Sequence, residues 1–365
     1  MNPRISRHAE ILVNHSVSVN KGDKVMIASP PQASELVEQL AHKIGEKKAV
    51  PMVVWWYDGK MTSAYKKGFG EGDFPIPEHF LEAIRESDAY IGIKAPANVK
   101  EGAEISSEVS SSYSQSMEKI LEAQLDTEWT VTQHPTDARA QEAGMSIREY
   151  EDFLYGAIDR DWQSLKDYQS QLADIIEGAG KLEIQSGDDT HLEMSIDGMH
   201  SGQENGTKNL PGSEVATAPV IDSVNGKVKF DYPVIHSGKE ITEVELVFED
   251  GEVIEFSAEE NEEVLESIVE ADEGSKRLGE VGFGMNSGID RFTANIYLDE
   301  KMAKTVHLAL GQAYEEEVGE GREVNNSAVH VDMLINMRKN SEIRADGNTI
   351  YRNGKYIFDE GFENL

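Results

Sequence analysis

The stretch Lys24-Val-Met-Ile-Ala28, together with residues 33–47 and 50–57 that follow it, decides the fold of the N-terminal half of this chain. The first and third segments are short apolar runs, which predict buried strands. In the segment between them, Leu36 and Leu40 recur at helical spacing and predict an amphipathic helix. Strand, helix and strand in this order form a β-α-β unit, which is typical of a parallel sheet.

The same alternation continues along the chain. Residues 89–93 and 129–132 predict two further strands, and helical patterns at residues 78–86 and 117–124 precede them. We therefore expect a doubly wound α/β domain in the first half. The turn after the first strand, Ser29-Pro-Pro-Gln-Ala33, lacks the G-x-G-x-x-G pattern of dinucleotide-binding folds. No nucleotide cofactor is therefore expected.

The character of the sequence changes near Gly180. Residues 181–184 and 191–196 alternate apolar and polar side chains, which is the period of a half-buried strand, and a glycine-containing turn between them predicts a hairpin. We therefore expect an N-terminal α/β domain at residues 1–180 and a C-terminal α+β domain at residues 181–365. The same patterns predict further helices at residues 145–165, 169–177, 262–270 and 300–317, and further strands at residues 228–232, 243–249 and 253–258.

Acidic residues outnumber basic ones by 68 to 34, which gives a net charge of -34. Residues 259–263 and 315–317 are dense acidic spots, but the excess is spread along the whole chain. A surface that binds nucleic acid needs a basic patch, and none is visible, so no nucleic-acid partner is expected. An acidic shell keeps a protein soluble at high salt, where charge repulsion is screened, and we therefore expect a salt-loving source.

The sequence has no feature of an exported or membrane-bound protein. No apolar run approaches the roughly 20 residues of a membrane span, and Arg4, Arg7 and Glu10 interrupt the apolar positions at the start of the chain. We expect a cytoplasmic protein that does not bind membranes. The absence of cysteine means that carboxylate and imidazole groups must hold any metal ion.

The first candidate site residues lie in Thr305-Val-His-Leu-Ala-Leu-Gly-Gln-Ala-Tyr314, within the helix predicted at residues 300–317. His307 and Tyr314 are seven residues apart, or two helical turns, so a helix would place them on one face. A buried imidazole and a buried phenol both need polar partners. The pattern fits either a ligand site or a core histidine with a backbone partner.

Three other segments carry candidate ligands. His330 and Asp332 are two residues apart, so a strand would place both on one face as ligands for Zn²⁺, Co²⁺ or Mn²⁺, or with the aspartate merely orienting the histidine. Glu280 lies among glycines, which permit close approach of a ligand or another backbone. Glu214 lies in a nearly uncharged segment between two prolines. In so acidic a chain, ordinary surface charge explains either glutamate equally well.

Taken in order, these segments resemble the thermophilic aminopeptidases of the aminopeptidase T/S group of metallopeptidases. The resemblance covers residues 145–365 strongly and the N-terminal domain in outline. The matching motifs are N-x-P-x-x-E-V-x-T-A-P at residues 209–219, S-V-N-G at 223–226, L-G-E-V-G-x-G-x-N at 278–286, the D-E-K to A-Y segment at 299–314, and N-x-S-x-x-H-x-D-M at 325–333.

The resemblance implies a homodimeric metalloaminopeptidase that hydrolyses N-terminal residues from peptides with a free N-terminus. Two divalent metal ions, Zn, Co or Mn, would be its cofactors. Tyr314 matches the family's catalytic tyrosine and is expected to donate a hydrogen bond to the oxyanion, while Glu280 is expected to relay the proton. The implied metal ligands are Glu214, Glu280, Glu300, His307, His330 and Asp332.

Two other functions stay open at this point. The same fold hosts a mononuclear iron dioxygenase that cleaves the ring of dihydroxypyridine, and His307, His330 and Asp332 would supply its three ligands. The other alternative is a non-catalytic binding protein that keeps a degenerate site. The presence of both Glu214 and Glu280, and of Tyr314, beside those three residues favours the peptidase.

Overall fold

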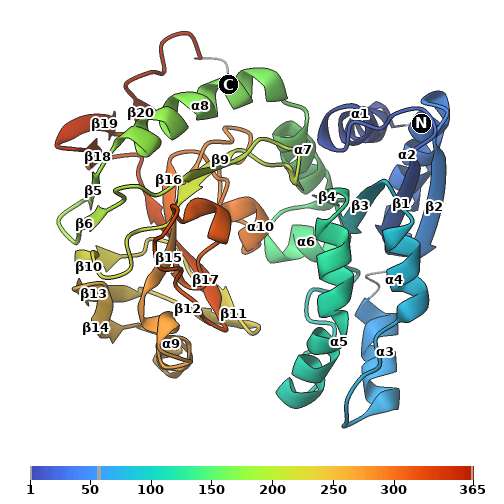
Figure 1. The fold of residues 1–365 in the computed structure, drawn as a ribbon, viewed down its shortest axis with the longest axis horizontal. Helices are drawn as coiled ribbons and strands as arrows, with labels where there is room; N and C mark the ends of the chain where they lie inside the picture. The colour runs from blue at the N-terminus through green and yellow to red at the C-terminus, as the bar shows by residue number, and fades with distance from the viewer. Residues whose placement is uncertain (1, 56–58, 363–364) are drawn as a thin grey trace. The chain divides into compact units, whose positions relative to one another are not determined.

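The computed structural model describes residues 2–55, 59–362 and 365. The chain divides into two compact units, which we call the first unit (Met1–Asp159 with Gly206–Gly212) and the second unit (Arg160–Asn205 with Ser213–Leu365). The first unit contains a parallel sheet with helices, and the second contains antiparallel sheets (Figure 1). This confirms the predicted fold class, an α/β domain followed by an α+β domain.

The first unit is built on a five-stranded sheet in the order β2-β1-β3-β4-β8, in which neighbouring strands are parallel. Its strands are β1 (Lys24–Ser29), β2 (Val50–Trp55), β3 (Ala89–Lys94), β4 (Glu128–Gln133) and β8 (Asn209–Leu210). The predicted β-α-β unit is therefore confirmed. Residues 56 and 57, the end of the strand predicted at 50–57, lie outside the described residues.

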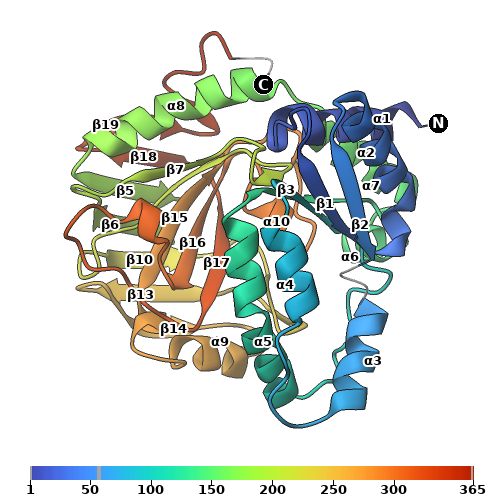
Figure 2. The same cartoon turned by 45° about the vertical axis from the view of Figure 1, so that its right-hand side comes forward.

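The first unit also contains the helices α1 (Pro3–Ile11), α2 (Ser34–Glu46), α3 (Gly59–Phe69), α4 (Glu78–Arg85), α5 (Ser107–Leu125), α6 (Asp137–Glu142) and α7 (Ile147–Ile158). Some of them lie against the sheet, whereas α3 extends away from it and contacts α5 (Figure 2). Helix α2 packs on β1 and β2. Helices α4 and α5 bury Phe80, Ile84 and Ile120 against Met26 and Tyr90. None of the helices in the described part of the chain has the length and apolar character that a membrane crossing requires.

The second unit contains an eight-stranded sheet, a five-stranded sheet and a two-stranded hairpin, and adjacent strands are antiparallel. The eight-stranded sheet has the order β14-β13-β10-β6-β5-β18-β19-β20, and its strands are β5 (Lys181–Ser186), β6 (Thr190–Ser195), β10 (Asn225–Lys229), β13 (Glu245–Glu249), β14 (Glu252–Ser257), β18 (Ser341–Ala345), β19 (Asn348–Arg352) and β20 (Lys355–Tyr356). The five-stranded sheet has the order β17-β16-β15-β9-β7, and its strands are β7 (Ser201–Glu204), β9 (Glu214–Thr217), β15 (Leu278–Gly284), β16 (Thr305–Gly311) and β17 (His330–Asn336). The remaining elements are β11 (Val234–His236), β12 (Lys239–Ile241), α8 (Trp162–Gly178), α9 (Glu262–Val269) and α10 (Ile296–Asp299).

The two large sheets of the second unit share one apolar core. Leu192 and Leu246 of the eight-stranded sheet belong to the same buried cluster as Phe283 and Leu308 of the five-stranded sheet. Because side chains alternate between the two faces of a strand, the neighbours of these core residues point to the opposite face of the five-stranded sheet. We call that opposite face the site face, because it carries the candidate ligands described below.

The prediction of a helix at residues 300–317 is wrong. Residues Thr305–Gly311 form β16, which pairs with β15 on one side and β17 on the other. Short apolar runs do not distinguish a buried strand from a helix, and here the pairing on both sides decides for the strand. His307 and Tyr314 therefore do not share a helical face, and Tyr314 instead precedes a 3-10 turn at Glu315–Glu317.

The helix predicted at residues 145–165 is in fact two helices. Helix α7 ends at Ile158 and α8 begins at Trp162, where the side chain of Asp161 caps the new helix by accepting a hydrogen bond from the Ser164 backbone. The first division between the compact units falls at this break, between Asp159 and Arg160. Helix α8 packs on β7 and β9 of the second unit.

Candidate metal centre

Adjacent strands of the five-stranded sheet each place a candidate ligand on the site face. Glu214 comes from β9, Glu280 from β15, His307 from β16, and His330 with Asp332 from β17. Antiparallel pairing brings these strands side by side although the residues are far apart in the sequence. The predicted strand arrangement of His330 and Asp332, two residues apart on one face, agrees with β17.

Two contacts in this cluster involve Glu280. His307 Nε2 lies 2.9 Å from Glu280 Oε1, and His330 Nε2 lies 3.6 Å from Glu280 Oε2. Asp332 Oδ1 is 3.4 Å from His330 Nε2. Glu280, His307 and Asp332 each offer one donor atom such that all three atoms lie within 4.8 Å of one another. These three residues could therefore hold one metal ion.

Small residues beneath the cluster make room for it. Gly282 is paired with His307 across β15 and β16, and a Cβ atom added to Gly282 would lie only 1.9 Å from His307 Nε2. Ala309 is paired with Asp332 across β16 and β17. The glycines around Glu280 thus permit the close approach that the sequence predicted, and the group that approaches Gly282 is an imidazole ring.

A fully buried lysine neutralises the side of the cluster nearest Glu214. Lys301 is 0% exposed and its Nζ lies 3.1 Å from Glu214 Oε1 and also contacts the carboxylate of Glu300. Glu214 Oε2 is 3.9 Å from His307 Nε2. Glu214 therefore adjoins the cluster directly, whereas the described contact of Glu300 is with Lys301.

The electrostatics of the cluster reflect its excess of carboxylates. Burial alone lowers the pKa of His307, but the hydrogen bond and charge of Glu280 outweigh burial and raise that pKa to about 10. Burial likewise opposes protonation of His330, while Asp332 and Glu280 raise its pKa to about 10. Without a metal ion, protons on the imidazoles balance the negative charge, and a cation would take over that role by displacing them.

The residues present fit a divalent cation. The donor atoms are carboxylate oxygens and imidazole nitrogens, the set that suits Zn²⁺, Co²⁺ and Mn²⁺. Glu214 Oε2 and His307 Nδ1 are buried and have no hydrogen-bond partner among the described residues. Buried polar atoms are normally paired, so an unpaired carboxylate oxygen beside the cluster fits a role in binding a cation.

Tyr314 lies at the edge of the cluster. Its ring centroid is 5.2 Å from that of His330, and 48% of the residue is exposed. Burial of its hydroxyl, together with the charges of Glu280 and Asp332, raises the pKa of Tyr314 above its ordinary value. Tyr314 therefore keeps its proton at neutral pH and can act as a hydrogen-bond donor.

Sequence patterns do not identify two residues of this region. Lys301 lies within the D-E-K motif, in which the resemblance indicates only the glutamate as a ligand. Glu317 is 6% exposed, although it belongs to the acidic run at residues 315–317, whose composition predicts surface charge. Nothing in the local sequence distinguishes Glu317 from Glu315 and Glu316, which are exposed.

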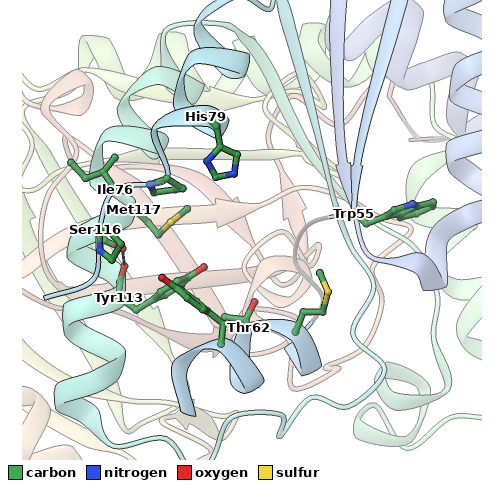
Figure 3. A pocket seen from close by; sticks show the side chains of 11 residues that line it. Trp55, Thr62, Ile76, His79, Tyr113, Ser116 and Met117 are labelled. Carbon is green, nitrogen blue, oxygen red and sulfur yellow. Dashed lines mark hydrogen bonds between the residues drawn. The ribbon is translucent and has the colours of Figure 1, made fainter. Parts of the chain in front are cut away.

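A separate apolar pocket lies within the first unit (Figure 3). It has a volume of about 490 Å³, and its described lining includes Trp55, Met61, Tyr65, Tyr113 and Met117. The described lining contains one histidine, His79, and no carboxylate. This pocket therefore lacks the donor set of a divalent-metal site.

Comparisons with known proteins agree with this chemistry. The family model of thermophilic metalloproteases (M29) matches residues 1–356. Aminopeptidase 2 of Geobacillus stearothermophilus is 26% identical, with 97% of this chain and 98% of the relative covered. The solved structure of wild-type AmpT from Thermus thermophilus has a TM-score of 0.86 and 24% identity, with 97% of this chain and 99% of that chain covered. The 2,5-dihydroxypyridine dioxygenase of Pseudomonas putida KT2440 shares the fold, with a TM-score of 0.64, 13% identity and 98% of each chain covered.

Proposed function

This chain belongs to the thermophilic metalloprotease (M29) family, and from that premise we propose that it is a metal-dependent aminopeptidase acting on peptides with a free N-terminus. The observation that carries the proposal is the buried cluster of Glu280, His307 and Asp332, whose donor atoms lie within 4.8 Å of one another. The relative in Geobacillus stearothermophilus, aligned over nearly its whole length, bears the name aminopeptidase.

We infer a dinuclear site. Its proposed ligands are Glu214, Glu280, Glu300, His307, His330 and Asp332, and its ions Zn²⁺, Co²⁺ or Mn²⁺. The number of carboxylates supports this, because Lys301 and one divalent ion together do not balance the four of them. Bound divalent ions supply Lewis acidity towards a peptide carbonyl group and towards water.

The side chains of the cluster carry the remaining steps of the proposed mechanism. Glu280 has both carboxylate oxygens near imidazoles, so it is positioned to take a proton from the attacking water and pass it to the leaving amine. Tyr314 keeps its phenolic proton and donates a hydrogen bond to the oxyanion of the tetrahedral intermediate. Its partial exposure leaves it accessible to a substrate.

We further propose that the protein is a cytoplasmic homodimer whose residues 181–365 form the catalytic domain, as the resemblance implies. Light scattering coupled to size-exclusion chromatography tests the dimer. A mass equal to one chain of 40.5 kDa would exclude it.

Hydrolysis of aminoacyl p-nitroanilides in the presence of Co²⁺, Zn²⁺ or Mn²⁺ at high salt tests the activity. We expect a chelator to abolish turnover, a divalent ion to restore it, and N-acetylated substrates to resist cleavage. Metal analysis of the active protein should give two ions per chain. No turnover of any unblocked aminoacyl substrate would exclude the aminopeptidase.

The dioxygenase alternative uses the same histidines. His307, His330 and Asp332 are the three residues of an iron-binding facial triad, and all three lie on the site face. The contacts of Glu280 with both imidazoles favour the peptidase, because a triad does not need this fourth ligand. One iron per chain with ring-cleaving activity and no peptidase activity would reverse the preference.

A further inference from the structure

Glu317 is a buried acid that the mechanism above does not use. It ends the 3-10 turn Glu315–Glu317 that follows Tyr314, and its backbone nitrogen donates to Tyr314 O at 3.0 Å. Its backbone oxygen accepts from His200 N at 2.9 Å. These two backbone hydrogen bonds fix the position of the turn, so the direction of the side chain is set by the fold.

One carboxylate oxygen of Glu317, Oε2, is unpaired. The residue is 6% exposed, and Oε2 has no hydrogen-bond partner among the described residues. An ionised carboxylate buried without a partner is costly, so proteins normally supply one. An unpaired buried carboxylate near a candidate active site therefore indicates that its partner comes from outside the chain.

The glycine of β7 places Glu317 over the site face. A Cβ atom added to Gly202 would lie 2.8 Å from Glu317 Oε1, so the carboxylate rests on this glycine. Gly202 is paired with Ala216 of β9, and Ala216 is paired with Gly282 of β15. The three residues form one row across the sheet, and their Cβ directions point to the same face.

This row joins Glu317 to the metal cluster. Glu317 covers one end at Gly202, and the imidazole of His307 covers the other end at Gly282. Neighbouring strands are about 4.8 Å apart, so the two ends are separated by roughly 10 Å. Between them, Ala216 contributes only a methyl group. Ala216 is 5% exposed, so this stretch between the acid and the cluster is buried.

We propose that Glu317 binds the free α-ammonium group of the peptide substrate and thereby restricts cleavage to the N-terminal residue, an inference that rests on the proposed aminopeptidase function. An α-ammonium group is two bonds from the scissile carbonyl carbon, so its acceptor must lie about one residue from the cluster. It carries three N–H donors and a positive charge, which a buried carboxylate matches with charge-assisted hydrogen bonds. A peptide with a blocked N-terminus lacks this positive charge and carries an additional acyl group, so Glu317 would not bind it.

The charges around Glu317 agree with a cationic ligand. Burial, followed by the negative charges of Glu280 and Glu214, raises the pKa of Glu317 to about 9. A bound ammonium group would offset both effects, because it supplies the opposite charge and hydrogen bonds to the ionised form.

Calorimetry with two small amides tests the proposal. Leucinamide carries the α-ammonium group, and 4-methylpentanamide has the same shape without it. Each is titrated into the chelator-treated protein, because the metal-loaded enzyme would hydrolyse leucinamide. We expect leucinamide to bind about 10 to 100 times more tightly, as charge-assisted hydrogen bonds predict. Equal binding of the two amides would show that metal alone holds the amine, and that result would overturn the proposal.

Variants at two neighbouring acids complete the test. E317Q keeps the shape of the side chain and should abolish the preference for leucinamide. E317D keeps the charge and should retain part of this preference. E316Q, at an exposed acid, is the matched control and should retain the full preference. E317Q should also raise the KM for leucine p-nitroanilide more than it lowers kcat. A preference that persists in folded E317Q, or a loss of bound metal from E317Q, would refute the role of Glu317. Inactivity of the wild-type protein with every divalent ion would instead refute the proposed function.

Discussion

Tyr314 is partly exposed and lies near several carboxylates. Because burial and the nearby charges of Glu280 and Asp332 raise its pKa, the hydroxyl remains protonated in the pH range where an aminopeptidase works. A neutral donor at the rim of an acidic site can stabilise an oxyanion without adding a charge that would compete with a metal ion. The residue therefore suits transition-state stabilisation better than metal binding.

Replacing Tyr314 by phenylalanine removes only this hydrogen bond. We expect kcat of Y314F to fall about 100-fold, the usual effect of losing one oxyanion donor. The bound metal, measured by elemental analysis, should be unchanged, because no proposed ligand is altered. A variant with wild-type kcat would show that the hydroxyl does not contact the oxyanion.

His8 in the first unit makes stability depend on pH. Its Nε2 lies 2.8 Å from Thr132 Oγ1, and burial, with a smaller effect of His134, lowers its pKa to about 3. An unfolded histidine has a pKa of about 6.5, so below that pH the unfolded chain binds a proton that the folded chain excludes. The contribution of neutral His8 is complete above pH 6.5 and is lost as the pH falls.

Denaturant titrations at pH 7 and pH 5 measure this effect. On account of His8, the free energy of unfolding should be about 2 kcal/mol lower at pH 5 than at pH 7. Each pH unit below 6.5 lowers it by about 1.36 kcal/mol. H8Q should lack this part of the pH dependence, and H42N, at an exposed histidine, is the control. Equal pH dependence in H8Q and the wild-type protein would contradict the assignment.

At the scale of elements, β16 shows where sequence reasoning fails. Val306, Leu308 and Leu310 enter the core, and His307 points to the site face, so the segment has the period of a strand. Its apolar run, however, suits a helix equally well when only local spacing is considered. The pairing with β15 and β17 decides the outcome, and such pairing depends on residues distant in the sequence.

The residues of the candidate site also divide into those that local spacing predicts and those that it does not. His330 and Asp332 could be placed on one face from a two-residue spacing, because that relation is local. The contact of Lys301 with Glu214 and the burial of Glu317 could not, because both depend on how strands and turns pack. Only the resemblance to a known family indicates the other candidate ligands, because their spacing is not local.

A glycine in β15 tests how the strands hold the ligands. In G282A, the new methyl group would meet the His307 ring at 1.9 Å and displace it from the site face. We expect metal affinity to fall about 10 to 100 times, as for other changes that misorient a ligand. Isothermal titration with Zn²⁺ into the metal-free protein measures this effect.

G92A provides the matched control in β3. There the nearest atom to an added Cβ is Tyr90 Cε1 at 3.3 Å, so the strand should accept the methyl group with a small shift and leave metal affinity unchanged. If G282A bound Zn²⁺ as tightly as G92A does, His307 would not be a ligand in this position.

At the scale of the whole molecule, the chain passes between its two compact units more than once. Residues 206–212 lie in the first unit, where β8 pairs with β4, although the preceding and following residues belong to the second unit. A boundary drawn at one point of the sequence cannot represent this path. The pairing of β8 involves only two residues, too few to leave a pattern in the sequence.

The net charge of -34 should make stability depend on salt. Repulsion among unpaired carboxylates opposes the compact state and is screened by ions. We expect the Tm to rise between about 0.05 M and about 0.5 M NaCl and then to level off, as the Debye length falls to a few ångströms. Thermal unfolding followed by circular dichroism measures the Tm at each salt concentration. A Tm that is constant or falls over this range would also argue against the salt-loving source expected from the composition.

The arrangement of one ligand or ligand pair on each of several neighbouring strands has a consequence for folding. Glu214 and Asp332 lie far apart in the sequence, and only the completed five-stranded sheet brings them together. Contacts of such high contact order form late, because the loops between the strands must close first. A metal ion would therefore bind the finished sheet and stabilise it by mass action, rather than nucleate it. Metal uptake would thus report that the last strand has docked.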